Sequence, residues 1–552
     1  MNAALATRTT LTRRTARVMA PYFHLEYQPW WPLVRNTLYA TMVVVVIFAS
    51  LLTALGGTAL LKIAAAPIGV LALLVIWMLP DVEQVRGVAR AADPPYLKLL
   101  LAFLLGLVMW PGYIAIVLPG LPWLTPPRVV LAFLLVSVVI HYAMHRESRE
   151  RAVAVFSHEK IPVRLYLTYV AINILVLPLA PSPGATIGFF SLLLIMSVSA
   201  VLAAAPFLTK QVYIERITTT LILGTIFSML VAVVENYMQS PPWAQHIPSF
   251  MQIDQGFLQN ILSPQARMGD SRYRIRSTFP IVLYYTQYLS LVMPLLLYAM
   301  WRMTGRKRIV GLLLLPLVLH TVWFCNARTA MLSLIIPLFG FGAMAAIRVF
   351  VAQKKGDSLK TGIQLAVVLL MVGMLGGVLA TSHRAQMYTF GGQQHNASND
   401  ARDRQWANAW KQLRKNPVGV GAGNSVNKVG IAVPGRDNLI IDSLFINLLV
   451  DTGYLGFICF FGSMMTSAYI GIRCFFRAAN HFEELAGGMA LGLISYVTAC
   501  AVVSTTDNLY ITFLLCGMIL GIARLQDQRR AEEARLARLP DNQGAVTTSR
   551  RQ

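Results

Sequence analysis

Charged residues are scarce in this sequence: they make up 13% of its 552 residues, whereas hydrophobic residues make up 56%. Soluble domains carry roughly 25% charged residues, so this shortage argues against a water-soluble fold. Apolar runs of about 20 residues, long enough to cross a bilayer as helices, recur along the whole chain. We therefore predict an all-α polytopic membrane protein.

The sequence also lacks the cysteine and histidine patterns of disulfide and metal sites. Its five cysteines lie in or beside apolar runs, where they are interpreted as small hydrophobic residues. Neither an HExxH motif, a zinc box, nor a phosphate-binding loop with its lysine is present. We expect no disulfide framework, no metal site and no cofactor.

Acidic residues are few as well: 24 Asp and Glu against 47 Lys and Arg give a formal net charge of +23. In a membrane protein, basic residues indicate which loops lie on the cytoplasmic side, so they are interpreted as topology signals and not first as a nucleic-acid site. The apolar runs predict about 14 transmembrane helices, within a range of 12 to 14. Most Lys and Arg residues then fall in alternate loops, which predicts that both termini are cytoplasmic.

This topology divides the chain into seven segments. They are a basic cytoplasmic arm (1–36), N-terminal transmembrane helices (37–237), an outward loop (238–278), further transmembrane helices (279–381), a large helical outward loop (382–453), C-terminal transmembrane helices (454–524) and a cytoplasmic tail (525–552). The arm is expected to be retained, because no signal-peptide cleavage site precedes the first apolar run.

Arginines near two expected span ends depart from the positive-inside rule. Arg274 and Arg276 precede the run 277–280 at the start of a span, and Arg328 lies in a short link between two spans. Guanidinium groups bind phosphate oxygens in pairs of hydrogen bonds, so these residues predict a phosphate site at headgroup depth. The alternatives are a basic interfacial anchor for the first two and a helix C-terminal cap for Arg328.

The large outward loop is expected to contain a helix that carries Arg402 and Arg404 near its start and stops at Pro417. Its apolar residues recur at helical spacing, which predicts one face that lies on the membrane or on the transmembrane body. These residues are Trp406, Trp410 and Leu413.

Beyond this helix the chain carries two further motifs. Glycines alternate at 419, 421 and 423, which is a weak phosphate-loop signal and is interpreted as a turn, with Gly421 at its centre. Asp442 and Ser443 then lie among apolar residues just before a span that begins near Gly453. Such a segment suggests a re-entrant or interfacial helix, with a functional carboxylate at Asp442. The alternative for Asp442 is a helix N-cap.

The order of these motifs over about 270–460 resembles the O-antigen ligase and bacterial polysaccharide polymerase family. The resemblance implies a GT-C-like membrane glycosyltransferase of the bacterial inner membrane, acting on the periplasmic side without metal or nucleotide. Its donor would be a glycan on undecaprenyl pyrophosphate. Carried over by motif, the residues that bind the donor pyrophosphate are Arg274, Arg276, Arg328, Arg402 and Arg404; the catalytic residues are Asp442 and Arg328; and those on the acceptor side or with a structural role are Ser443, Trp406 and Gly421.

One departure from the family pattern bears on the acceptor. Ligases that attach O-antigen to lipid A-core carry a His-Asn pair where this chain has Asp442-Ser443. The difference favours a polymerase that joins lipid-linked repeat units into a surface polysaccharide or exopolysaccharide. An O-antigen ligase and a protein O-oligosaccharyltransferase remain alternatives, and a flippase is less favoured because ionisable residues are few within the spans. The expected partners are the lipid-linked donor and acceptor, the bilayer and other polysaccharide-assembly proteins, but no nucleic acid.

Overall fold

The computed structural model describes residues 96–117, 123–253, 255–263, 273–353, 396–432 and 439–537. The chain divides into two compact units, one made of residues 1–91 with 142–146 and the other of residues 92–141 with 147–552. Almost all of the described residues belong to the second unit. The parts of the predicted transmembrane segments at 37–95 and 354–381 lie outside the described residues.

Helices make up almost all of the ordered structure in the described ranges. They are α5 (Leu97–Met109), α6 (Pro126–Met144), α7 (Arg146–His158), α8 (Lys160–Val176), η2 (Leu177–Leu179), α9 (Pro183–Ala204), η3 (Phe207–Thr209), α10 (Gln211–Met238), η4 (Ser249–Met251), α11 (Gln255–Leu262), α12 (Val282–Arg302), α13 (Lys307–Phe324), α14 (Arg328–Gln353), α17 (Asn396–Lys415), α18 (Ser425–Val429), α19 (Leu444–Arg477), α20 (His481–Cys500) and α21 (Leu509–Leu536). Two short strands, β1 (Ile431–Ala432) and β2 (Leu439–Ile440), pair antiparallel.

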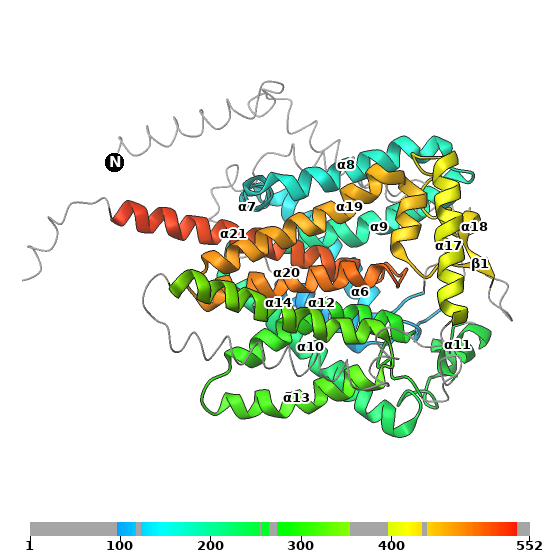
Figure 1. Cartoon of the computed structure of the whole chain (residues 1–552), viewed down its shortest axis with the longest axis horizontal. Coiled ribbons are helices and arrows are strands. Elements are labelled where there is room, and N and C mark those ends of the chain that lie inside the picture. The colour runs from blue at the N-terminus through cyan, green and yellow to red at the C-terminus, as the bar shows by residue number, and fades with distance from the viewer. Residues whose placement is uncertain are drawn as a thin grey trace, which may run out of the picture. The chain divides into compact units, whose positions relative to one another are not determined.

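Nine helical segments within the described ranges are long and apolar enough to cross a membrane. They are α6, α8 with η2, α9, α10, α12, α13, α14, α19 and α21. Many of these helices run side by side in Figure 1. The predicted all-α, multi-pass membrane fold is therefore confirmed, while the total of about 14 spans and the GT-C-like arrangement stay predictions.

The centre of the bundle is formed by helices whose side chains are buried on nearly all sides. Within their most apolar stretches, 78% of the α12 residues and 89% of the α21 residues are buried. α12 packs against α10, α13, α14 and α20, and α19 packs against α8, α20 and α21. A helix that is apolar on all sides buries the most apolar surface when other helices enclose it, which explains why α12 and α21 lie at the centre.

The segments expected to face outward gather at one end of the bundle (Figure 1). There α17 crosses the ends of the long helices next to α18 and β1, and α11 lies at the same end. The segment that follows α5 joins the 249–253 segment through the amide of Ala115, which donates to the carbonyl of Met251 at 3.2 Å. Large loops of both halves of the chain thus cover one end of the helices.

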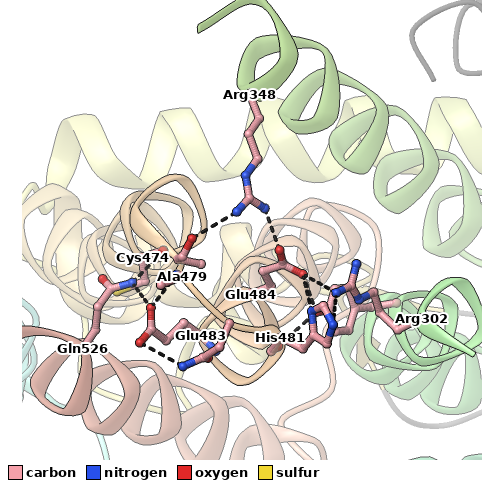
Figure 2. Close-up of polar contacts among 11 residues, drawn as sticks. Arg302, Arg348, Cys474, Ala479, His481, Glu483, Glu484 and Gln526 are labelled. Carbon is pink, nitrogen blue, oxygen red and sulfur yellow. Dashed lines mark hydrogen bonds and ion pairs between the residues drawn. The ribbon is translucent and has the colours of Figure 1, made fainter. Parts of the chain in front are cut away.

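The opposite end carries a network of ion pairs (Figure 2). Glu484 in the first turn of α20 binds Arg348 of α14 at 2.6 Å and accepts a hydrogen bond from Tyr298 of α12 at 2.8 Å. Its neighbour Glu483 pairs with Arg529 of α21 at 2.6 Å. Two adjacent carboxylates therefore join α12, α14, α20 and α21 at the end that the positive-inside pattern assigns to the cytoplasm.

Candidate functional site

The segment 273–280 is wound around one buried carboxylate, that of Glu235 near the end of α10. The Tyr273 hydroxyl donates to one carboxylate oxygen at 2.7 Å, and the amides of Arg276 and Ser277 donate to the other at 3.0 and 2.6 Å. Ser277 adopts a positive φ of 55°. Because these contacts fix both the backbone turn and a side chain, Glu235 determines the conformation of the arginine-bearing segment.

The two predicted arginines of this segment differ in where their guanidinium groups lie. Arg276 is fully buried at 0% exposure, with its Nε 3.7 Å from the Glu235 carboxylate. Arg274 is half-buried, and its Nε donates to the carbonyl of Cys325 at 3.4 Å, which brings it to the link that carries Arg328. Arg274 is thus the one placed at the solvent-accessible side of the segment.

Arg328 begins α14 and lies beside that link. The preceding Asn326 has a positive φ of 46°, which turns the chain sharply between α13 and α14. The Arg328 side chain is half-buried, and its Nε and Nη2 are enclosed without a hydrogen-bond partner among the described residues. These two atoms therefore do not cap the carbonyls of α13, and they remain available to an anion.

Arg402 lies in α17, the helix of the large loop. The positive charge of Arg402 acts on Arg328, and the Arg402 Nε is likewise buried without a hydrogen-bond partner in the described ranges. One turn further along α17, the Gln405 side chain accepts a hydrogen bond from the Asp442 amide at 3.2 Å. Arg404 is exposed and lies about 200° around the helix from Arg402, away from this cluster.

Asp442 and Ser443 lie where the large loop enters α19. Ser443 is buried, it occupies the N-cap position of α19, and its hydroxyl donates to the carbonyl of Cys500 at 3.4 Å. The Leu444 amide donates to the carbonyl of Val503 at 3.2 Å. Asp442 is half-buried and precedes the N-cap, so its side chain is free of the capping role that the sequence left open.

The segment 501–508 brings a carboxylate, Asp507, that the sequence analysis did not single out. The Asp507 side chain reaches solvent, yet burial by the surrounding protein raises its pKa, opposed by a hydrogen bond from Thr505 and by the charge of Arg128. The adjacent Asn508 donates to the Gln287 side-chain oxygen at 3.0 Å. The residue that follows Asp507 is therefore bound to the first turns of α12.

Those turns of α12 also contact the start of α14, because the hydroxyls of Thr286 and Thr329 lie 2.5 Å apart. Asn508 and Thr329, the residues that follow Asp507 and Arg328, thus contact adjacent residues of the same helix end. A polar run at 504–508 between two apolar spans is the sequence signal for Asp507. For Glu235, the signal is a carboxylate within an apolar span.

The glycine-rich turn is held by another carboxylate, that of Asp451. It accepts hydrogen bonds from the amides of Gly423, Asn424 and Ser425 at 2.8, 3.1 and 2.7 Å. A row of amides can bind phosphate, but here a side chain of the protein occupies it. This contact agrees with the interpretation of the glycines as a turn and leaves their phosphate-loop signal without support.

The turn and α19 also meet through glycines with positive φ. α19 is kinked at Gly453, which has φ 65°, and a Cβ there would lie 2.2 Å from the carbonyl oxygen of Pro417. Gly421 has φ 91°, and a Cβ there would lie 2.7 Å from the Ala180 side chain. At Gly453 the backbones of the turn and of α19 approach too closely for a side chain, whereas at Gly421 the positive φ and the Ala180 side chain together favour glycine. The kink separates the short helix predicted before the span from the span itself.

The apolar face of α17 is only partly the one expected. Leu413 is buried as predicted, and Trp406 is half-buried. Trp410 is 45% exposed, and the core-facing positions are instead taken by Gln405 and Ala409. Because these positions are three and four residues apart, the buried stripe is rotated toward the side that carries Arg402.

Residues 317–461 match the family model described as O-antigen ligase. This range is about a quarter of the chain, and it includes Arg328, Arg402 and Asp442, the Asp451-held turn and the kink at Gly453. No curated protein matches the chain. The family match confirms the resemblance that the sequence motifs indicated.

Proposed function

We propose that this multi-pass membrane protein, which carries the O-antigen ligase region at 317–461, is a polymerase of lipid-linked oligosaccharide repeat units. The donor would be a glycan on undecaprenyl pyrophosphate, and transfer would take place on the periplasmic side of the bacterial inner membrane. The product would be a surface polysaccharide or an exopolysaccharide. Metal and cofactor are not required in this proposal.

The observation that carries this proposal is the pair formed by Arg328 and Arg402. Two guanidinium groups from different parts of the chain lie within reach of each other's charge, with buried nitrogen atoms that bond to no described residue. Buried donors without partners and like charges at short range are both unfavourable. An anion with several oxygens, such as a pyrophosphate, would satisfy the donors and offset the repulsion.

The chemistry follows from this placement. The acceptor sugar hydroxyl attacks the anomeric carbon of the donor, its proton passes to a carboxylate, and the bond from that carbon to the pyrophosphate oxygen breaks. The departing pyrophosphate takes the bonding electrons, and Arg274, Arg328 and Arg402 stabilise the charge that develops. We assign Asp442 to orienting or deprotonating the acceptor hydroxyl. Asp507 is a second carboxylate at the same end of the bundle.

Arg276 and Arg404 enter the proposal differently from the other arginines. Arg276 supports the segment that presents Arg274: it is fully enclosed with Glu235, although none of its guanidinium nitrogens is hydrogen-bonded to a described residue. Arg404 points to solvent, where a flexible guanidinium adds positive charge near the site without a fixed contact. Ser443, which begins α19, and Gly421, in the Asp451-held turn, fit structural roles.

The experiment that tests the function uses purified wild-type protein in detergent with a metal chelator. A lipid-linked repeat unit is added with and without lipid A-core, and the products are separated on a gel. We expect a ladder of lipid-linked polymers in the absence of lipid A-core. Consumption of the donor only when lipid A-core is present would make the protein a ligase, and no consumption under either condition would contradict glycosyl transfer.

The two carboxylates can be separated in the same assay. We expect Asp442→Asn to lower the turnover rate by about 10²-fold to 10⁴-fold, the range for loss of a general base, with unchanged donor binding. Asp507→Asn is expected to lower turnover less. The reverse order would transfer the role of base to Asp507. In that case the wild-type rate would rise with pH at values above the usual pKa range of aspartate. The reason is that burial raises the pKa of Asp507 and only its ionised form accepts a proton.

A further inference from the structure

Three aromatic side chains form a ladder at the outward end of the bundle. The Trp406 and Trp410 rings lie 6.0 Å apart with 28° between their planes, and the Trp410 and Tyr454 rings lie 6.4 Å apart with 31° between theirs. Trp410 is 45% exposed and Tyr454 is 42% exposed. The ladder therefore presents a nearly continuous aromatic surface to whatever surrounds this end of the protein.

The ladder starts next to the proposed pyrophosphate site. Trp406 follows Arg402 by one turn of α17 and Trp410 follows it by two, so Trp410 lies about 12 Å along the helix from Arg402. A glycan whose pyrophosphate contacts Arg402 and Arg328 can reach Trp410 only with sugars beyond the one that reacts. The aromatic surface is thus placed for the distal part of a donor or acceptor chain.

The two segments that carry the rings are held together by tight backbone contacts. The Asp451 carboxylate holds the turn that follows α17, and the kink at Gly453 places Tyr454 at the start of the long part of α19. Tyr454 reaches Trp410 because the turn and the kink touch at Pro417. A binding surface held in this way loses little conformational entropy when a ligand is bound.

We propose that Trp406, Trp410 and Tyr454 form a carbohydrate-binding platform for sugars of the lipid-linked chain beyond the reacting residue. Aromatic faces carry partial negative charge, and the C–H bonds on one side of a pyranose ring present partial positive charge to them. The platform rests on the proposed glycosyl transfer. It would retain the growing chain between additions and so favour longer products.

The polar surroundings on α17 favour sugar over lipid as the occupant. Asp403, Arg404, Lys411 and Arg414 are all exposed on this helix, and burial of such side chains in hydrocarbon is costly. Interfacial tryptophans and tyrosines that anchor a protein in the membrane lie at the headgroup level beside apolar residues. Trp406 and Trp410 instead lie on a polar helix that leads to an arginine cluster, whereas Tyr454 adjoins the exposed Leu455 of α19.

The kinetic test compares Trp410→Ala with wild type in the polymerisation assay. Trp301→Ala is the matched control, since Trp301 is 52% exposed and ends α12 at the opposite end of the bundle. We expect Trp410→Ala to raise the KM for the lipid-linked repeat unit about fivefold to tenfold, to leave kcat within about twofold, and to shorten the products. Trp410→Phe should recover most of the loss. An unchanged KM and product length would overturn the platform.

A binding measurement decides the proposal independently of turnover. The probe is the oligosaccharide released from the lipid-linked repeat unit by mild acid, titrated into the purified protein in a calorimeter. We expect a saturable heat change in wild type and in Arg328→Ala, and none in Trp410→Ala. Absence of transfer together with this pattern would contradict only the proposed function, whereas absence of binding to wild type would contradict the platform.

A membrane role for the ladder gives a different result in vesicles. The protein is reconstituted in vesicles of brominated phosphatidylcholine, and the emission of Trp410 is obtained as the difference between wild type and Trp410→Phe. We expect this difference emission to be as strong as in unbrominated vesicles. Strong quenching by the brominated lipid would show that Trp410 lies in the bilayer and would overturn the platform.

Discussion

Arg328→Ala is expected to lower polymerisation by about 10²-fold to 10³-fold, the range observed when one donor to a developing oxyanion is removed. The reason is that Arg328 offers two enclosed nitrogen atoms that bond to no described residue, so a pyrophosphate oxygen is their natural acceptor. Arg328→Lys should recover little, because an ammonium group cannot supply the paired donors of a guanidinium group.

The matched control for this experiment is Arg414→Ala, which removes an exposed arginine from the far end of α17. Turnover is measured with the lipid-linked repeat unit and a metal chelator, and folding is checked by thermal unfolding in detergent. The double variant Arg328→Ala with Arg402→Ala should lose less than the sum of the single free-energy changes, since the two side chains act on one ligand. Equal activity of Arg328→Ala and Arg414→Ala would refute the arginine-held pyrophosphate.

Glu235→Ala is expected to have the largest effect on stability. It leaves Arg276 as a buried charge without its carboxylate, and loss of one partner of a buried ion pair costs about 3–5 kcal/mol. It also removes the acceptor for the Tyr273 hydroxyl and for the amides of Arg276 and Ser277. The segment that carries Arg274 should then lose its conformation, and activity should fall with stability.

The measurement is the midpoint of thermal unfolding of purified protein, compared with Glu215→Ala on the same helix. Glu215 lies at the other end of α10 and its carboxylate is bonded only to the exposed side chain of Gln211 in the described structure. Adding Arg276→Met to Glu235→Gln should recover part of the midpoint, because no buried charge then remains unpaired. A midpoint for Glu235→Ala equal to that of Glu215→Ala would disprove the central role of Glu235.

Apolar runs and the distribution of charge were sufficient to predict the membrane fold. α6, α8, α9 and α10 lie within the predicted transmembrane segment 37–237 to within one residue, and α12, α13 and α14 lie within the predicted segment 279–381. The physical reason is that the hydrocarbon core requires each spanning segment to satisfy its own backbone hydrogen bonds and to be apolar. Each span is therefore specified by its own composition. The motif order also singled out Arg328, Arg402 and Asp442 as candidate site residues, and all three lie within the range that matches the family model.

The roles of individual side chains depended on tertiary contacts. The sequence predicted the same role for Arg274 and Arg276. The structure shows that Arg276 is enclosed beside the buried carboxylate of Glu235, whereas Arg274 is half-buried. The sequence likewise could not indicate that Asp451 occupies the amides of the glycine turn. Composition reports whether a segment enters the membrane, whereas partners distant in sequence decide which charged side chains are enclosed and which are accessible.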